Sequence, residues 1–317
     1  MAELLPISAI VPTRHRPVAF SRTLHSLAEQ SVQPTEMIVV DGSSDDQTKE
    51  LCHSQIPGLV TEIKYYRAIE IGAATQRNQA VAHATQDFIW LMDDDILLEL
   101  ECLARLWAAL NCDPKIGGVN AMITNQRYLP PGRISRTLFQ LLHGKTEVSY
   151  AGKCIGPALN LLPEDREDLP EIVPVEWLNT TCALYRQKAL PQPLFSSQFT
   201  GYSLMEDVTL SLMVGKHWKL VNARTARIFH DSQPGDHKNN LGVLSKMSFL
   251  NRHYVMTQIL ERRSPADHLK LIGLQLFEIA ASLQTLQGWR SLPSVLFGKL
   301  EAGIKIMHSK SQTVSSQ

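Results

Sequence analysis

Three adjacent aspartates are the part of this sequence that most directly suggests chemistry. Asp93, Asp94 and Asp95 follow an apolar run in the stretch DFIWLMDDDILLE, residues 87–99. Adjacent carboxylates repel one another, and burying one without a partner is costly, so a cation is expected beside them. In an extended chain Asp93 and Asp95 point to one side and Asp94 to the other. Divalent Mg²⁺ or Mn²⁺ takes such oxygen ligands together with substrate phosphates.

Polar residues also follow two earlier apolar runs. ISAIVPT (7–13) continues into RHRP, and EMIVVDG (36–42) contains Asp41 and continues into SSDD. Each has an ordinary explanation, since Asp41-Gly42 suits a turn and Ser44 or Asp45 suits a helix cap. If these runs are parallel strands, however, their carboxyl ends meet at one edge of a sheet, where such folds bind ligands. This convergence predicts a binding site.

The segments between the runs predict the elements that position these residues. Pro17 suits a first helical turn, and helix-like stretches cover 71–85 and 97–111. A fourth strand-like run covers 116–124. Strands that alternate with helices predict an α/β fold, with a largely parallel sheet and helices on both of its faces. Residues 125–172 contain several prolines and charges and are interpreted as an irregular insertion.

Composition narrows the class of protein. Lys plus Arg and Asp plus Glu both total 31, so the formal charge is zero and no nucleic acid partner is expected. The five cysteines include no C-x-x-C pair, which argues against a disulfide framework and a thiolate zinc site. We find no secretory signal and no run of about 18 apolar residues. A cytoplasmic protein is expected, with the cytoplasmic face of the membrane as an alternative location.

The order of the motifs resembles glycosyltransferase family 2, the inverting nucleotide-sugar transferases with the GT-A fold, which implies a mixed, mostly parallel sheet. The resemblance covers roughly residues 7–231 and rests on four segments: AIVPTRHRP, IVVDGSSDD, ATQRNQAVAHATQDFIWLMDDDI and GYSLMEDVTLSLMVGKHW. A D-x-D pattern alone is common, whereas the ordered set is specific. The resemblance implies a transferase that makes a polysaccharide, cell-wall glycan or glycolipid.

The resemblance implies a donor site at matching positions. Pro12, Thr13 and Arg14 would line the nucleobase pocket, and Asp41 would contact the base or ribose. Arg77, of the Arg77-Asn78 pair, would lie near the diphosphate, which suits a guanidinium because it binds phosphate oxygens bidentately. An ordinary turn role for Asp41 and a solvated helix position for Arg77 are the alternatives.

The resemblance also implies a D-x-D metal site for Mn²⁺ or Mg²⁺. Asp93 would face the ribose and the metal, and Asp95 would hold the metal. The run of three blurs the register, so Asp94 remains a competitor for the metal and is otherwise assigned to the donor nucleotide. His230 follows a strand-like run where relatives place a histidine that contacts metal or phosphate; a structural role is the alternative.

A general base is the remaining requirement, because the acceptor hydroxyl loses its proton as it attacks. The resemblance assigns this role to Asp207, with Glu206 beside it binding the acceptor or orienting the base. Helix capping is the ordinary interpretation of such a pair. The implied substrates are a nucleotide-diphospho-sugar, with a UDP-sugar favoured, and a hydroxyl of a glycan or lipid-linked glycan.

The family pattern divides the chain. We predict a catalytic domain over residues 1–235, with a nucleotide-binding half (1–124) and an acceptor-binding half (125–235). A helical C-terminal extension follows over 236–310, and a disordered tail over 311–317. The extension's amphipathic helices are expected to pack on protein, with peripheral membrane association as the alternative.

Two other functions compete with transfer. A nucleotidyltransferase that makes sugar nucleotides shares the β/α layout, but PTRHRP lacks the glycines expected of its phosphate loop. A catalytically silent nucleotide-sugar-binding scaffold would have nearly the same sequence, and only the intact acidic set argues against it. A dinucleotide-binding dehydrogenase is opposed by the absence of G-x-G-x-x-G after the first strand.

Overall fold

A large, mostly parallel sheet forms the centre of the first part of the chain in the computed structural model, which describes residues 2–233 and 240–314. Within these residues nine strands form one sheet in the order β3-β2-β1-β4-β10-β6-β11-β5, with β9 beside β11. The strands and their bounds are β1 (Glu3–Thr13), β2 (Val32–Asp41), β3 (Glu62–Arg67), β4 (Phe88–Met92), β5 (Ile96–Leu98), β6 (Ile116–Ile123), β9 (Ile172–Val175), β10 (Cys182–Arg186) and β11 (Lys219–His230).

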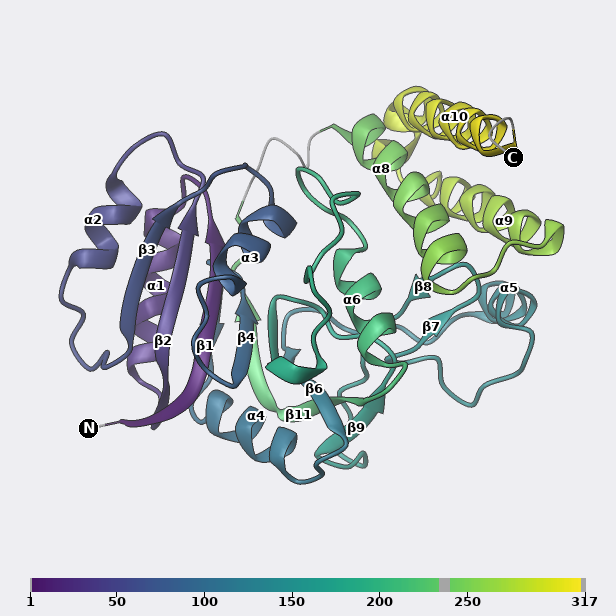
Figure 1. Cartoon of the computed structure of the whole chain (residues 1–317). Coiled ribbons are helices and arrows are strands. Elements are labelled where there is room, and N and C mark those ends of the chain that lie inside the picture. Colours follow the sequence, from purple (N-terminus) through teal and green to yellow (C-terminus); the bar gives the residue numbers. More distant parts are fainter. Residues whose placement is uncertain (1, 234–239, 315–317) are drawn as a thin grey trace. The chain divides into compact units, whose positions relative to one another are not determined.

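Strands β3, β2, β1 and β4 are parallel neighbours, as Figure 1 shows. Strand β10 is antiparallel to both β4 and β6, while β6 and β11 are parallel. The sheet is therefore mixed and mostly parallel, and the predicted fold class is confirmed. In this register Thr13 pairs with Asp41, so the ends of β1 and β2 lie side by side.

Helices cover both faces of the sheet, as predicted. Helices α1 (Pro17–Ala28) and α4 (Cys102–Asn111) share one apolar core with β1, β2 and β4, whereas α3 (Ala73–Val81) packs on β1 and β2 outside that core. Pro17 occupies the first turn of α1, as its fixed φ predicted. Further helical elements of the described residues before β11 are α2 (Gln47–His53), η1 (Gln187–Ala189) and α6 (Glu206–Val214).

The segment predicted to be an irregular insertion contains a helix, so that prediction was wrong for part of it. Helix α5 (Arg133–His143) ends at Gly144, which has φ +83° and donates its amide to the Gln140 carbonyl at 2.8 Å. Glycine adopts this left-handed conformation without steric cost. Two short strands, β7 (Cys154–Ile155) and β8 (Leu159–Asn160), pair later in the segment.

The chain divides into two compact units. Unit 1 comprises residues Met1–Pro130, Ser149–Cys154 and Asn160–Gln233, and unit 2 comprises Pro131–Val148, Ile155–Leu159 and Pro234–Gln317. Unit 2 is helical: it contains α5, α8 (Leu241–Tyr254), the π-helical turn η2 (Val255–Ile259), α9 (Pro265–Ser282) and α10 (Leu286–Val314). The predicted domain boundaries remain predictions.

The end of the chain is partly described. Helix α10 runs to Val314, into the segment predicted as a disordered tail, and residues 315–317 lie outside the described residues. No helix in the described part of the chain has the length and apolar character needed to cross a bilayer.

Candidate active site

The three aspartates form the turn between β4 and β5, and main-chain bonds hold this turn in place. The Asp93 amide donates to the Thr181 carbonyl at 3.0 Å. The Asp94 carbonyl accepts from the Thr23 hydroxyl at 2.9 Å, and the same hydroxyl accepts from the Ile96 amide at 3.2 Å. Helix α1, which carries Thr23, thus fixes the backbone from which the carboxylates project.

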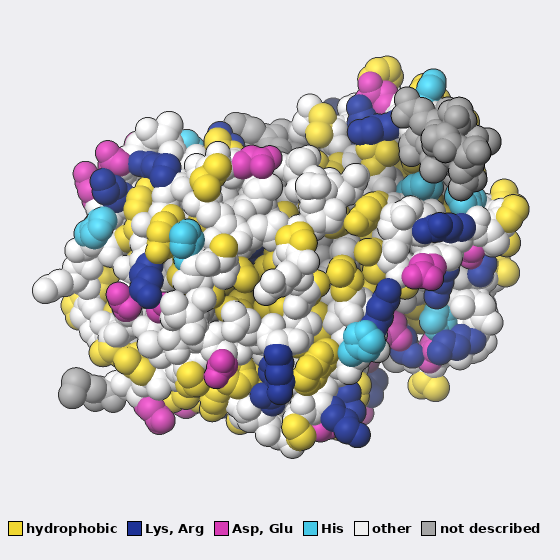
Figure 2. All heavy atoms as spheres, in the orientation of Figure 1, with side chains coloured by type: hydrophobic (Ala, Val, Ile, Leu, Met, Phe, Trp, Pro, Cys, Tyr) yellow, Lys and Arg dark blue, Asp and Glu magenta, His cyan; other side chains and the backbone are white. Residues whose placement is uncertain are grey.

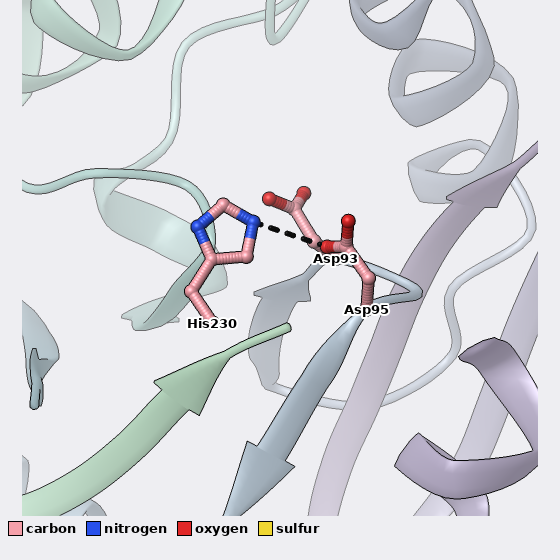
Figure 3. Close-up of side chains that lie close together, drawn as sticks. All are labelled: Asp93, Asp95 and His230. Carbon is pink, nitrogen blue, oxygen red and sulfur yellow. Dashed lines mark hydrogen bonds and ion pairs between the residues drawn. The ribbon is translucent and has the colours of Figure 1, made fainter. Parts of the chain in front are cut away.

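Asp93 and Asp95 turn toward His230, which ends strand β11 (Figure 3). One potential ligand atom from each of the three side chains lies within 4.8 Å of the others, and His230 Nε2 is 3.1 Å from Asp95 Oδ1. Two carboxylate oxygens and one imidazole nitrogen form a donor set that Mn²⁺ accepts, as do other divalent ions of similar hardness. The residues present therefore fit a divalent cation.

The surroundings of Asp95 stabilise its ionised form. Burial alone would raise its pKa, but the hydrogen bond and charge of His230, the Gln233 amide and the charge of Arg16 outweigh burial and lower the pKa. Gln233 donates to Asp95 Oδ2 at 3.2 Å. A carboxylate held ionised in a buried position is suited to binding a cation.

Asp94 faces a different set of partners. Its carboxylate accepts from the Thr13 hydroxyl at 2.6 Å and from Arg16 at 3.3 Å, and the same guanidinium lies 3.2 Å from Asp95. Burial raises the pKa of Asp94 to about 7. Among the described residues, Asp94 does not belong to the group of three side chains that could hold a metal ion. This arrangement agrees with the alternation expected for an extended chain.

Arg77 connects the aspartate turn with helix α6. Its Nη2 is 2.5 Å from Asp93 Oδ1, and its Nη1 is 3.4 Å from Glu206 Oε1. Only 3% of Arg77 is exposed, and its Nε has no hydrogen-bond partner among the described residues. A buried guanidinium with an unpaired N–H donor is suited to binding a further anionic group. Its neighbour Asn78 instead pairs with both main-chain groups of Phe195.

Glu206 and Asp207 begin helix α6. Burial raises the pKa of both carboxyls, to about 6 for Asp207 and well above the usual range for Glu206, where the Asp207 charge adds to the effect. The Val208 amide donates to Asp207 Oδ1 at 2.7 Å. The pair therefore has one carboxyl beside Arg77, Glu206, whose raised pKa favours the protonated form, and one, Asp207, whose pKa is raised to about 6.

Asp41 is fully buried at the end of β2, where three neighbours satisfy it. Its Oδ1 accepts from the Ser43 amide at 2.8 Å and its Oδ2 from the Tyr65 hydroxyl at 3.0 Å, with Arg67 at 3.3 Å. These contacts agree with the turn interpretation of Asp41. Its predicted contact with a nucleoside remains a prediction.

Sequence reasoning missed two residues of this edge, Arg16 and Gln76. Arg16 contacts Asp94 and Asp95, whereas Arg14 is exposed and Pro12 is half-buried, and their place around the nucleobase remains a prediction. The carboxamide of Gln76 donates to the Thr13 and Val40 carbonyls at 3.0 and 2.8 Å and so links the ends of β1 and β2. Both residues lay within the quoted motifs, but spacing in a loop does not show which side chain turns inward.

Comparison with known proteins gives a consistent family. The model of "Glycosyl transferase family 2" matches residues 8–190. A "PGL/p-HBAD biosynthesis glycosyltransferase" of Mycobacterium tuberculosis is 30% identical over 138 residues, 42% of this chain and 54% of the relative. A "GalNAc(5)-diNAcBac-PP-undecaprenol beta-1,3-glucosyltransferase" of Campylobacter jejuni is 29% identical over 107 residues, 33% of this chain and 34% of the relative. The chain thus spans about half the length of the first of these curated relatives.

Two solved structures share the fold. The mannosyltransferase PcManGT from Pyrobaculum calidifontis, solved with GDP-Man and Mn²⁺, has a TM-score of 0.52 at 15% identity and covers 98% of this chain and 81% of its own. GalNAc-T7, solved with UDP, GalNAc and Mn²⁺, has the same score and identity and covers 77% and 47%. At this identity the likeness concerns the fold alone.

Proposed function

Because this chain belongs to glycosyl transferase family 2 and has the GT-A fold, we propose that it transfers a sugar from a nucleotide-diphospho-sugar to a hydroxyl of a glycan or lipid-linked glycan. A UDP-sugar is the proposed donor. The observation that carries the proposal is one connected set of side chains. Asp93, Asp95 and His230 can hold a cation, and Arg77 links Asp93 to the carboxylate pair of α6.

A divalent cation, Mn²⁺ or Mg²⁺, is the proposed cofactor, and Asp93, Asp95 and His230 are the residues that would hold it. When bound, such a cation offsets the negative charge of the donor diphosphate. Both solved neighbours were determined with Mn²⁺, which supports this assignment.

Arg77 and the β1–β2 edge are proposed to bind the donor. The unpartnered Nε of buried Arg77 is a donor that a diphosphate oxygen would satisfy. Pro12, Thr13, Arg14 and Asp41 would surround the nucleoside, with Asp94 behind them bonded to Thr13. A UDP-sugar and a GDP-sugar would use the same residues, so the choice between them is left to the substrate assay.

Asp207 is proposed as the general base. The acceptor oxygen forms a bond to the anomeric carbon as the bond from that carbon to the diphosphate oxygen breaks. The electron pair leaves with the nucleoside diphosphate, and the hydroxyl proton passes to the Asp207 carboxylate. Attack opposite the departing group inverts the anomeric configuration. A base with a pKa of about 6 is ionised at neutral pH and still accepts a proton readily.

Glu206 is proposed to orient the base or to bind the acceptor. Its carboxyl lies beside Arg77, and its raised pKa favours the protonated form, which can donate a hydrogen bond. A protonated Glu206 would also spare Asp207 the repulsion of a second negative charge.

Nucleotide release from a panel of UDP- and GDP-sugars tests the proposal. We expect release with one donor in the presence of Mn²⁺ and an acceptor extract, loss of release after chelation, and recovery when Mn²⁺ is restored. Release of pyrophosphate from a nucleoside triphosphate and a sugar phosphate would instead indicate a nucleotidyltransferase. Donor binding without any turnover would indicate a silent scaffold.

A further inference from the structure

Helix α9 of unit 2 presents an apolar face to solvent. Leu269, Ile272 and Leu276 are 68%, 49% and 61% exposed, and their spacing of three and four residues places them on one side of the helix. The charged side chains of α9 interact with other residues of the protein and do not cover this apolar face. Lys270 donates to the Leu142 carbonyl at 3.2 Å, and Glu278 lies 3.3 Å from Lys299.

Helix α10 repeats this pattern over a greater length. Its exposed large apolar side chains recur at helical spacing, and Trp289, Phe297 and Leu300 are each about 60% exposed. The set comprises Leu286, Trp289, Leu296, Phe297, Leu300, Ile304 and Met307. Single exposed apolar residues are ordinary, but two stripes on neighbouring elements of one unit indicate a binding surface.

Charge indicates what covers this surface. By sequence unit 2 carries 13 Lys and Arg against six Asp and Glu, whereas unit 1 carries 18 against 25. Inside unit 2, Glu278 pairs with Arg252 and Lys299, and Glu301 pairs with Lys246. The acidic side chains Glu278 and Glu301 are thus neutralised by cations of the same unit. Figure 2 shows Lys, Arg and His side chains, with some acidic ones, among hydrophobic side chains over α5 and α9.

Two cations border the apolar stripe of α10. At 100° per residue, Arg290 and Lys305 fall on one flank of the stripe, and both are exposed. A second copy of this chain that docked through the same surface would bring an equally basic unit to the contact and would be repelled. Anionic lipid headgroups would be attracted, while the apolar side chains and Trp289 enter the boundary between headgroups and acyl chains.

We propose that α9 and α10 form a docking surface for a bilayer containing anionic lipid, on which the helices lie without crossing it. This inference deepens the proposed function by naming the acceptor as a lipid-linked glycan presented at that bilayer. This statement about the acceptor rests on the proposed function. The occupant itself, an anionic lipid surface, is argued from unit 2 alone.

Vesicle flotation with the full-length protein tests the inference. Phosphatidylcholine vesicles with and without phosphatidylglycerol serve as probes. We expect binding to the anionic vesicles, weakened by salt. The Arg290→Gln/Lys305→Gln variant should lower the partition coefficient about fivefold per charge. Ile272→Gln/Leu276→Gln should lower it at least about tenfold, since two apolar side chains no longer enter the lipid.

Matched controls come from exposed positions of unit 1. Leu100→Gln and Lys49→Gln/Lys115→Gln should bind vesicles like wild type. All variants should keep the wild-type thermal midpoint and metal-dependent nucleotide release with a water-soluble acceptor. No vesicle binding by a protein that still releases nucleotide would overturn the inference alone, whereas absent release would count against the proposed function. A dimer that Ile272→Gln/Leu276→Gln converts to monomer in ultracentrifugation would also overturn it, in favour of a second copy.

Discussion

At the scale of single residues, the site separates carboxylates by their surroundings. Asp95 is held ionised by His230, Gln233 and Arg16, whereas burial raises the pKa of Asp207 to about 6. A cation ligand must stay ionised, and a base must exchange a proton near working pH. The two kinds of surroundings therefore match the two proposed roles.

Replacing the proposed base tests its role. Asp207→Asn should lower kcat by about 10²–10⁴-fold, because the acceptor hydroxyl loses its proton acceptor, while donor affinity changes little. The measurement is single-turnover transfer together with nucleotide-sugar binding by calorimetry. The control, Asp168→Asn, changes an exposed carboxylate of unit 1 and should transfer normally. Transfer by Asp207→Asn at close to the wild-type rate would remove Asp207 from the mechanism.

The pH profile should reveal the same group. Because Asp207 acts as a base when ionised and its pKa is raised to about 6, kcat/KM should be flat above that pH and fall about tenfold per unit below it. The fall begins about two units above the ordinary aspartate value of 3.8. A profile that stays flat down to pH 4.5 in a protein that remains folded would contradict the assignment.

At the scale of elements, polar side chains join the strands that carry the site. Glu36 on β2 is 1% exposed and accepts from the Ser8 hydroxyl of β1 at 2.5 Å, from Lys64 of β3 at 2.6 Å and from the Thr85 amide at 2.7 Å. Burial alone would raise its pKa, but these partners outweigh burial and lower it. One carboxylate thus cross-links the strands that end in Thr13 and Asp41.

Glu36→Gln should lower the free energy of unfolding by about 2–3 kcal/mol at pH 7, because the charge-assisted bonds are lost. The folded pKa lies below the ordinary 4.5, so this contribution is full above pH 4.5 and is lost as pH falls through the folded value. Urea unfolding at pH 7 and pH 3 measures both. Glu62→Gln, at an exposed residue 3.6 Å from the same Lys64, should cost under about 1 kcal/mol. Equal losses for the two variants would show that the buried network contributes little.

The sequence predicted the strands well where it contained a clear apolar run. The apolar runs that became β1, β2, β4 and β6 were continuous, since strands buried on both faces have no polar side to alternate with. Helix α5 was missed because Pro130 and Pro131 lie just before it and its exposed face carries Ile134 and Leu141. The sequence alone does not show that an apolar residue of a helix faces solvent and not the core.

The candidate site, like the helices and strands, could be predicted in part from the sequence. The aspartate turn was evident because adjacent like charges need a partner, and the sheet topology brings it beside Thr13. The salt bridge of Arg77 with Glu206 joins residues 129 positions apart, so only the folded chain defines it. Arg16 was missed for the same reason: its contacts with Asp94 and Asp95 are set by tertiary structure.

At the scale of the whole molecule, a formally neutral chain is divided into an acidic unit and a basic unit. Unit 1 holds the carboxylates proposed for catalysis, and unit 2 holds the exposed apolar helices with their flanking cations. A neutral total therefore conceals two surfaces suited to different partners. The proposed cation site lies wholly within unit 1, so its proposed ligands can be tested without reference to unit 2.

Calorimetric titration of the full chain with Mn²⁺ tests the central claim most directly, because it reads the cation site without requiring an acceptor. In the presence of nucleoside diphosphate, Asp95→Asn should weaken Mn²⁺ binding by at least about tenfold, since a ligand and its charge are lost. Asp45→Asn, at a carboxylate outside the metal-binding group, should bind Mn²⁺ like wild type. Unchanged Mn²⁺ affinity in a folded Asp95→Asn variant would contradict the account.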